Sequence, residues 1–260
     1  MGVVNVTPDS FSDGGLHDTT AGAVEHARRL LAAGADVVDV GGESTRPGSD
    51  PVPDDVELSR VIPVIEALAA EGVVVSVDTT KAAVAVAAME AGAEIINDIT
   101  AAGGQGMAET MASSGAGIVL MHMQGTPRTM QHEPRYADVV GEVRDFLLTR
   151  ASHVESAGVA RQAVMVDPGI GFGKTVDHNL TLIRRVGDLV ATGYPVMVGA
   201  SRKGFLGRIL DVDDPAQRDV ATAAVTALVV ASGVAGLRVH DVASSRQAAL
   251  VAWSVTRSPS

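Results

Sequence analysis

The chain has 260 residues, no cysteine and a formal net charge of −11. These values rule out disulfides and thiolate metal sites, and they argue against binding to nucleic acid or to an anionic membrane, which needs basic patches. Hydrophobic residues make up 46% and aromatic residues only 3%, so the core must consist of Ala, Val, Leu and Ile. The sequence begins without a secretion signal, and its most apolar stretch, residues 221–234, is too short to span a bilayer. We therefore expect a soluble, cytoplasmic protein.

Strands and helices are expected to alternate along the whole chain. Glycine favours the left-handed conformation that often follows a helix, and each of seven glycines stands between a helical stretch and an apolar run. These are Gly34, Gly72, Gly92, Gly115, Gly158, Gly193 and Gly233. The expected strands cover residues 2–6, 36–41, 73–78, 94–97, 117–121, 163–167, 195–199 and 235–239. Seven helix-to-strand junctions require eight strand–helix units, the number in a (β/α)8 barrel.

We predict that residues 1–260 form a single (β/α)8 TIM barrel domain. A doubly wound open sheet also alternates strand and helix, but the regular units show no reversal point that would favour it. The long loops over residues 7–19, 42–54 and 124–135 each follow a strand. In a barrel such loops gather at the mouth formed by the carboxyl ends of the strands, where active sites are built.

Polar residues cluster at the predicted strand ends. A buried carboxylate there is costly unless it is paired. A lone aspartate at a strand end commonly caps the next helix, and Asp39 fits this interpretation. Capping does not explain the whole set, which comprises Asn5, Asp39, Asp78, Asn97, His122, Asp167, Ser201, Arg202, Lys203, Arg238, His240 and Asp241. The set therefore predicts a functional site.

The residue types in this set indicate two kinds of ligand group. Two carboxylates and an amide (Asp78, Asp167 and Asn97) suit a flat heterocycle, because a carboxylate accepts two parallel hydrogen bonds from an amino-imino edge. On the other side of the pocket, cationic side chains would hold a polyanion. The side chains of Arg238 and His240 lie on the same face of their strand, because side chains alternate with period two. The candidates for the polyanion are Arg46, Lys203, Arg238 and His240.

The glycine-rich run over residues 168–175 follows a predicted strand and precedes a helix, as a phosphate-binding P-loop does. Pro168 stands where the P-loop pattern requires its first glycine. We interpret these glycines instead as positions where the backbone must let a flat ring approach closely. The chain also contains no Gly-x-Ser-x-Gly sequence, so a serine nucleophile elbow is not expected.

Eight short motifs together resemble the dihydropteroate synthases, in order and almost from end to end of the chain. They are NVTPDSFSDGG at 5–15, GGESTRPG at 41–48, SVDT at 76–79, INDI at 96–99, LMHMQG at 120–125, DPGIGFGK at 167–174, GASRK at 199–203 and RVHD at 238–241. The resemblance implies a condensation of 6-hydroxymethyl-7,8-dihydropterin pyrophosphate with para-aminobenzoate, giving 7,8-dihydropteroate in folate biosynthesis. It also implies a homodimer, which we expect to form through the Ala-rich last helices.

The same resemblance implies which residues bind each substrate. The pterin is expected among Asp78, Asn97, Ile99, Met121, Asp167, Phe172, Gly199 and Lys203. The pyrophosphate is expected at Asn5, Arg46, Arg238 and His240, with Mg2+ bridging its oxygens near Asn5. Para-aminobenzoate is expected at Phe11, Thr45, Arg46, Pro47, Ser201 and Gly204. Asp78, Lys203, Arg238 and His240 are the implied catalytic residues.

The implied chemistry proceeds without a covalent enzyme intermediate. Pyrophosphate departs first and the amine then attacks the pterin cation, so basic groups stabilise the leaving group while Asp78 stabilises the cation. The chain departs from the family at Gly204, where many relatives carry a serine, and it starts inside the first predicted strand, where relatives usually have a short leader. Two alternatives are a non-catalytic pterin-binding paralogue and a methyltetrahydrofolate–corrinoid methyltransferase, which would have no need of an anion site.

Overall fold

The computed structural model describes residues 1–7, 16–46 and 48–257. Within these ranges the strands follow the predicted order, and each begins and ends within two residues of its expected bounds. They are β1 (Gly2–Asn5), β2 (Val38–Gly41), β3 (Val75–Asp78), β4 (Ile95–Asp98), β5 (Gly117–Met121), β6 (Val164–Asp167), β7 (Met197–Val198) and β8 (Gly236–Leu237). All neighbouring strands pair in parallel.

Two junctions close the strands into a ring. Strands β1 to β6 form one sheet in chain order, and β7 pairs with β8. A bridge between Val166 and Val196 connects β6 to the residues before β7, and a second bridge connects Gly2 of β1 to Val239. At this second junction the Val3 amide donates to the Val239 carbonyl at 3.1 Å. The predicted (β/α)8 barrel is therefore confirmed, and the open sheet is excluded.

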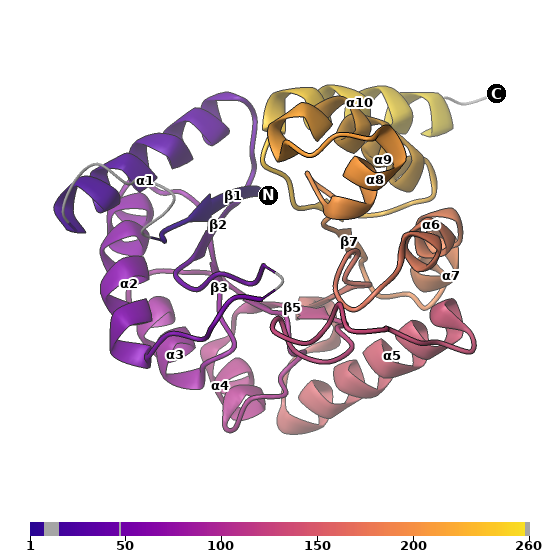
Figure 1. Ribbon diagram of the computed structural model, residues 1–260. Coiled ribbons are helices and arrows are strands. Elements are labelled where there is room, and N and C mark those ends of the chain that lie inside the picture. The colour runs from indigo at the N-terminus through magenta and orange to yellow at the C-terminus, as the bar shows by residue number, and fades with distance from the viewer. Residues whose placement is uncertain (8–15, 47, 258–260) are drawn as a thin grey trace.

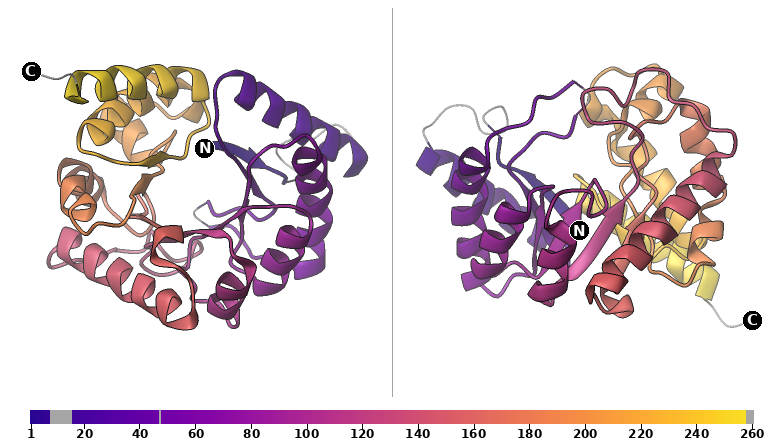
Figure 2. Two further views of the ribbon diagram at one scale, coloured as in Figure 1. Left: turned by 180° about the vertical axis from the view of Figure 1, so that it is seen from behind. Right: turned by 90° about the horizontal axis from the view of Figure 1, so that it is seen from below.

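Helices surround the strands on the outside (Figures 1 and 2). They are α1 (Leu16–Ala32), α2 (Asp54–Ala70), α3 (Ala82–Glu90), α4 (Met107–Ser114), α5 (Val139–Ala157), α6 (Val176–Arg184), α7 (Val186–Val190), α8 (Gly204–Leu210), α9 (Asp219–Ala231) and α10 (Val242–Arg257). The seven glycines predicted to end helices all have positive φ, from 68° to 117°. A residue with a Cβ is strained in that conformation, which explains why glycine occupies these positions. None of the described helices has the length and apolarity that a membrane span requires.

Alternate residues of each strand face the helices and form the main core. Val38 and Val40 of β2 and Val75 and Val77 of β3 are fully buried there together with Ile65 of α2. The β-branched residues suit a sheet that is covered on its outer face. The intervening residues point into the barrel, and their chemistry differs between its two ends.

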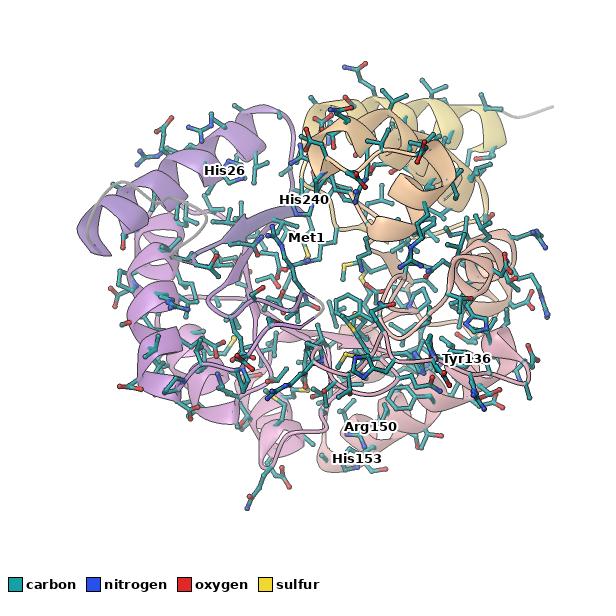
Figure 3. The ribbon with its side chains drawn as sticks, in the orientation of Figure 1. Met1, His26, Tyr136, Arg150, His153 and His240 are labelled. Carbon is teal, nitrogen blue, oxygen red and sulfur yellow. The ribbon has the colours of Figure 1, made fainter. Side chains whose placement is uncertain are left out.

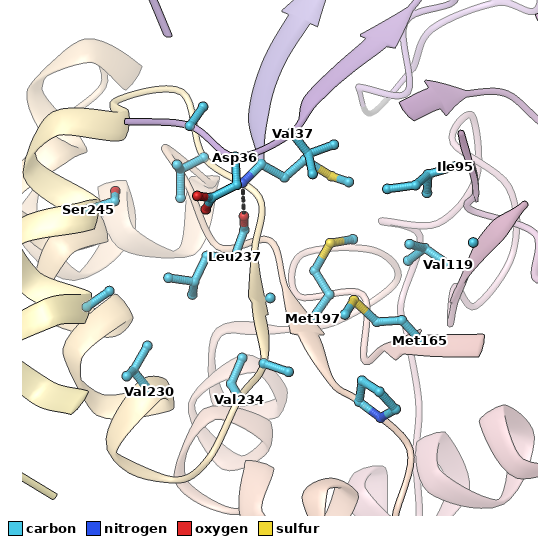
Figure 4. A pocket seen from close by; sticks show the side chains of 18 of the residues that line it. Asp36, Val37, Ile95, Val119, Met165, Met197, Val230, Val234, Leu237 and Ser245 are labelled. Atoms are coloured by element: carbon cyan, nitrogen blue, oxygen red, sulfur yellow. Dashed lines mark hydrogen bonds between the residues drawn. The ribbon is translucent and has the colours of Figure 1, made fainter. Parts of the chain in front are cut away.

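The amino-terminal end of the barrel holds an apolar cavity of about 730 Å3 (Figure 4). Its walls include Val119, Met165 and Met197 from inside the barrel and Trp253 from α10. The amino group of Met1 donates to the Leu237 carbonyl at 3.0 Å on its rim. This cavity lies at the opposite end from the predicted site.

Candidate active site

At the carboxyl ends of the strands, one guanidinium joins two buried carboxylates. Arg238, which follows β8, donates from Nε to Asp39 Oδ2 at 2.6 Å and from Nη2 to Asp78 Oδ2 at 2.7 Å. Asn97 Nδ2 donates to the same Asp39 oxygen at 3.1 Å. These contacts connect four strands, β2, β3, β4 and β8. The capping interpretation of Asp39 is therefore wrong, because this fully buried carboxylate points into the barrel and pairs with Arg238.

This network also differs from the two separate patches expected from the sequence. Acidic and basic groups are interleaved, with Arg238 between two carboxylates. Burial raises the pKa of Asp78 to about 7, although the charge of Arg238 opposes the shift. Burial disfavours the charge on Arg238 as well, but the carboxylates of Asp39 and Asp78 outweigh it and raise the pKa of the guanidinium. Arg238 therefore stays charged, while Asp78 titrates near neutral pH.

Asp167, the last residue of β6, lies beside this network. Its Oδ1 accepts a hydrogen bond from the Gly169 amide at 2.7 Å. A Cβ placed on Gly199 would lie 3.8 Å from Asp167 Oδ2 and 3.7 Å from Arg238 Cβ. Asp167 and Arg238 thus both lie beside Gly199 at the same mouth of the barrel. Burial raises the pKa of Asp167, partly offset by Lys203.

Lys203 follows β7 and reaches across to the loop after β6. Its ammonium donates to the Ile170 carbonyl and lies 4.1 Å from the centroid of the Phe172 ring. Burial lowers the pKa of Lys203 to about 7, against the opposing charge of Asp167. This lysine therefore changes charge in the same pH range as Asp78.

The glycines after β6 let other atoms come close to the backbone, but at Gly169 and Gly171 those atoms belong to the protein itself. At Gly169, with φ of 65°, an added Cβ would lie 1.9 Å from the His122 carbonyl oxygen. At Gly171 it would lie 2.7 Å from Lys203 Cδ. The expectation that these positions accommodate a ligand ring is thus corrected for Gly169 and Gly171, because main chain and side chain already fill the space.

Below this loop lies a buried amine whose role the sequence analysis missed. Lys174 is 2% exposed, and its Nζ lies 2.9 Å from His122 Nδ1 and donates to the Phe172 carbonyl at 2.9 Å. Burial lowers the pKa of Lys174 well below its usual range and that of His122 to about 3. Lys174 therefore supports the backbone of Phe172 as a buried hydrogen-bond donor. The only signal in the sequence was its place in the failed P-loop pattern.

His240 is oriented by Ser201. The Ser201 hydroxyl accepts the His240 backbone amide at 3.1 Å and lies 3.0 Å from the ring Nδ1. Since the hydroxyl accepts from the amide, its own proton is free to bond Nδ1, which favours a proton on Nε2. Burial lowers the pKa of His240 to about 4, assisted by Arg238, Arg202 and Arg46. His240 is thus a neutral donor inside the ring of helices (Figure 3).

Arg202, one of the polar residues predicted to cluster at the strand ends, pairs with the first residue of α9. Its Nε and Nη2 donate to the two carboxylate oxygens of Asp219, both at 2.7 Å. Its backbone is left-handed, with φ of 57°, and its amide donates to Thr222 Oγ1. Arg202 therefore fixes the turn that places its neighbours Ser201 and Lys203.

The remaining predicted residues that the structure describes lie around the same mouth. Asn5 ends β1 and is half-buried, whereas Ile99 and Met121 are buried at the ends of β4 and β5. Thr45 and the exposed Arg46 lie on the loop after β2, and exposed Gly204 begins α8. Phe11 and Pro47 lie outside the described residues. Within the described ranges, no group of three or more His, Cys, Asp or Glu side chains is placed to hold a metal.

Comparison with known proteins first defines the class. The model of the family described as "Pterin binding enzyme" matches residues 1–240. A dihydropteroate synthase from Neisseria meningitidis serogroup C is 46% identical, over 97% of this chain and 90% of the relative. The chain belongs to the dihydropteroate synthase family.

Solved structures agree with this assignment. The dihydropteroate synthase of Xanthomonas albilineans with 4-aminobenzoic acid has a TM-score of 0.94 and 45% identity, covering 100% of this chain and 93% of that one. A structure of the enzyme from the same organism in complex with 7,8-dihydropteroate has a TM-score of 0.90 and 43% identity, covering 100% and 94%.

Proposed function

We propose that the protein condenses 6-hydroxymethyl-7,8-dihydropterin pyrophosphate with para-aminobenzoate, releasing pyrophosphate and 7,8-dihydropteroate. The observation that carries this proposal is that Asp167 and Arg238 both come close to Gly199. A carboxylate and a cation therefore stand next to each other at the barrel mouth. The two Xanthomonas relatives were solved with 4-aminobenzoic acid and in complex with 7,8-dihydropteroate.

The pterin would lie between the acidic side chains. Asp167 accepts from its amino-imino edge, since a carboxylate matches two parallel donors, and Lys203 donates to the ring carbonyl. Asn97 and Asp78 would bond the other edge, with Ile99, Met121 and Phe172 as the apolar walls. This role of Lys203 requires the ammonium to leave the Ile170 carbonyl or to share its donors, of which it has three.

The pyrophosphate would lie toward Arg46, Arg238 and His240. Arg238 has its Nε and one Nη committed to carboxylates, so Nη1 is the nitrogen that remains for an anion. His240 would donate from Nε2 as a neutral ring, and a bound anion would raise the pKa of that ring from about 4. Para-aminobenzoate would then bind by Thr45, Arg46, Ser201 and Gly204.

In the reaction the carbon–oxygen bond to pyrophosphate breaks, and the bonding pair leaves with the anion. The exocyclic methylene of the pterin becomes cationic, the amine nitrogen attacks it, and the amine loses a proton. Asp78 in its ionised form stabilises the cation, and Arg238 and His240 stabilise the departing anion. Both kinds of charge are therefore met by groups that are already oriented before the substrates bind.

Magnesium remains part of the proposal. Mg2+ commonly keeps several waters and is held by one or two protein oxygens together with substrate phosphates. The side-chain oxygen of Asn5 fits such a site better than it fits an all-protein cage, which the described residues do not provide. When bound, the ion supplies positive charge that lowers the cost of pyrophosphate departure.

We also propose a homodimer through α9 and α10, two helices that pack against each other. Exposed apolar side chains on these helices support it: Val220, Leu228, Leu250, Val251, Trp253 and Val255. Exposed apolar residues that gather on one surface often mark protein–protein contacts. Light scattering on the wild type and on a Val251→Glu variant tests this.

The cytoplasmic location stays a prediction.

The activity is tested directly with purified protein, Mg2+ and both substrates. We expect release of pyrophosphate together with dihydropteroate, detected by chromatography, and no dihydropteroate when para-aminobenzoate is omitted. Tight binding of the pterin pyrophosphate without product at saturating substrate would refute the proposal in favour of the non-catalytic paralogue.

A further inference from the structure

The loop between β2 and α2 closes at a narrow neck. Glu43 stands near its start and Val52 near its end, and Glu43 Oε2 accepts the Val52 amide at 3.1 Å. Between them, the Ser49 hydroxyl donates to the carbonyls of Ser44 at 2.5 Å and Arg46 at 2.8 Å. The loop is therefore bonded within itself. Beyond the neck it contacts the loop after β5, through the Gly48 amide and the Pro127 carbonyl and through the exposed Asp50–Arg128 pair.

One ammonium holds both sides of this neck to the barrel. Lys81 Nζ donates to Glu43 Oε2 at 2.6 Å, to the Val52 carbonyl at 2.7 Å and to Glu57 Oε2 of α2 at 2.6 Å. An ammonium has three donors, and here each of them has a partner. We call Lys81, Glu43, Glu57 and the Val52 carbonyl the loop clasp.

The clasp is sheltered from water, unlike the ion pairs on the outer helices. The side chains of Lys81 and Glu43 are 19% and 20% exposed, and that of Glu57 is 1% exposed. The Arg28–Glu71 pair, by contrast, is 52% and 38% exposed. Removing one partner of a sheltered pair is costly because it leaves a buried charge, whereas an exposed pair contributes little. The clasp therefore resists opening.

The position of the clasp connects the two halves of the proposed site. Lys81 lies three residues after Asp78, and its amide donates to Thr79 Oγ1 at 3.2 Å. On the other side, the loop carries Thr45 and Arg46, and the charge of Arg46 is close enough to help lower the pKa of His240. The clasp thus sets the loop relative to the end of β3.

We propose that Lys81 is a positioning residue that holds the β2–α2 loop so that Thr45 and Arg46 face para-aminobenzoate and the pyrophosphate. This inference rests on the proposed function and adds a residue that touches neither substrate. It predicts that opening the clasp weakens the second substrate selectively and leaves the pterin ring pocket intact.

The first test opens the neck without exposing a new buried charge. Glu43→Ala removes the acceptor shared by Val52 and Lys81 but leaves Lys81 paired with Glu57. We expect the KM for para-aminobenzoate to rise about tenfold or more, as for loss of a charge-assisted hydrogen bond. The Kd for 6-hydroxymethyl-7,8-dihydropterin, which lacks the pyrophosphate, should change less than about twofold. Glu43→Gln keeps an acceptor oxygen and should recover most of the KM.

The lysine itself is tested in a background that does not leave the buried carboxylate of Glu57, 1% exposed, without its cation. Lys81→Met combined with Glu57→Gln should raise the same KM, whereas Glu57→Gln alone should have a smaller effect. Arg28→Met is the matched control, since it breaks an exposed pair, and it should leave both constants unchanged. An unchanged KM in Glu43→Ala, or equal losses for para-aminobenzoate and the pterin, overturns the inference.

Hydrogen exchange gives a second measurement that needs no turnover. The Val52 amide, bonded to Glu43, and the Gly48 amide, bonded to the Pro127 carbonyl, should exchange faster in Glu43→Ala than in the wild type. Equal exchange rates in Glu43→Ala and the wild type would contradict the proposal that the clasp holds the loop. A wild-type protein that makes no dihydropteroate refutes the proposed function instead, while the exchange rates still decide whether the clasp holds the loop.

Discussion

The two ends of the barrel interior are built from the same strands and differ in chemistry. On β6, Met165 faces the apolar cavity, and Asp167, two residues later on the same face, lies at the mouth. On β7, Met197 lines the cavity and Gly199 follows at the mouth. The buried charged side chains that point into the barrel, Asp39, Asp78 and Asp167, lie at the mouth. At the other end the charged groups that line the cavity are the Met1 amine, Asp36 and Arg246, which stand around a largely apolar interior.

The largest effect is expected from removing the shared cation. Arg238→Met leaves Asp39 and Asp78 without their partner, and breaking such a buried pair costs about 3–5 kcal/mol of unfolding free energy. The charge of Arg238 opposes the raised pKa of Asp78, so without it the pKa of Asp78 rises further. The folded state then binds more protons than the unfolded state, and stability falls as pH increases. In urea unfolding, the unfolding free energy of the variant should fall further below that of the wild type at pH 8 than at pH 6. Activity should fall about 100- to 1000-fold.

The matched change at the other end is Met165→Leu, which conserves volume. It should cost less than about 1.5 kcal/mol of stability and leave the kinetic constants unchanged. A loss of activity in Met165→Leu comparable to that in Arg238→Met would show that the two ends are not functionally distinct.

The next effect is expected at Asp167. Asp167→Asn keeps the shape of the side chain but replaces one acceptor with a donor, so the amino-imino edge of the pterin loses a partner. Pterin binding should weaken by about 1–3 kcal/mol, the cost of an unpaired buried group, while para-aminobenzoate binding to the pterin-loaded protein changes little. Calorimetric titrations measure both, and equal losses for the two ligands would contradict the assigned pocket.

The pH profile should reveal the charges at the mouth. Asp78, with a raised pKa of about 7, becomes protonated as pH falls, and Lys203, with a lowered pKa of about 7, loses its proton as pH rises. If both charged forms are required, kcat/KM falls about tenfold per pH unit on each side of a narrow maximum near neutrality. Lys203→Arg should remove the alkaline limb because arginine stays charged. An unchanged alkaline limb in that variant would assign the limb to another group.

The fold was predictable because its signals are local. Gly34 and Gly72 each end a helix and have the positive φ that the sequence analysis required, and each is followed by an apolar run that becomes a strand. Closure followed from the number of repeated units. The strand bounds were less well predicted at β7 and β8, where regular pairing covers only two residues each.

The site was predictable as a set of residues at strand ends but not as a network. The pairing of Arg238 with Asp39 spans 199 positions in sequence, and no local pattern indicates which carboxylate a distant arginine will meet. The burial of Lys174 and the three contacts of Lys81 were missed for the same reason. Residue type and spacing locate the mouth, whereas pairings across the barrel arise only when the ring closes.

The smallest expected effect concerns Gly204, which stands where the family pattern has a serine. A Cβ on Gly204 would meet no atom within 4 Å, so a side chain fits there without strain. In Gly204→Ser the added hydroxyl lies beside Lys203 at the rim and can bond the benzoate carboxylate. The KM for para-aminobenzoate should fall a few-fold, as expected for one net hydrogen bond of about 0.5–1.5 kcal/mol. Gly204→Ala, which adds the carbon but not the hydroxyl, should leave this KM unchanged. Equal KM values in the two variants would show that the hydroxyl makes no contact with the substrate, and that the mouth of this barrel binds the carboxylate by other groups.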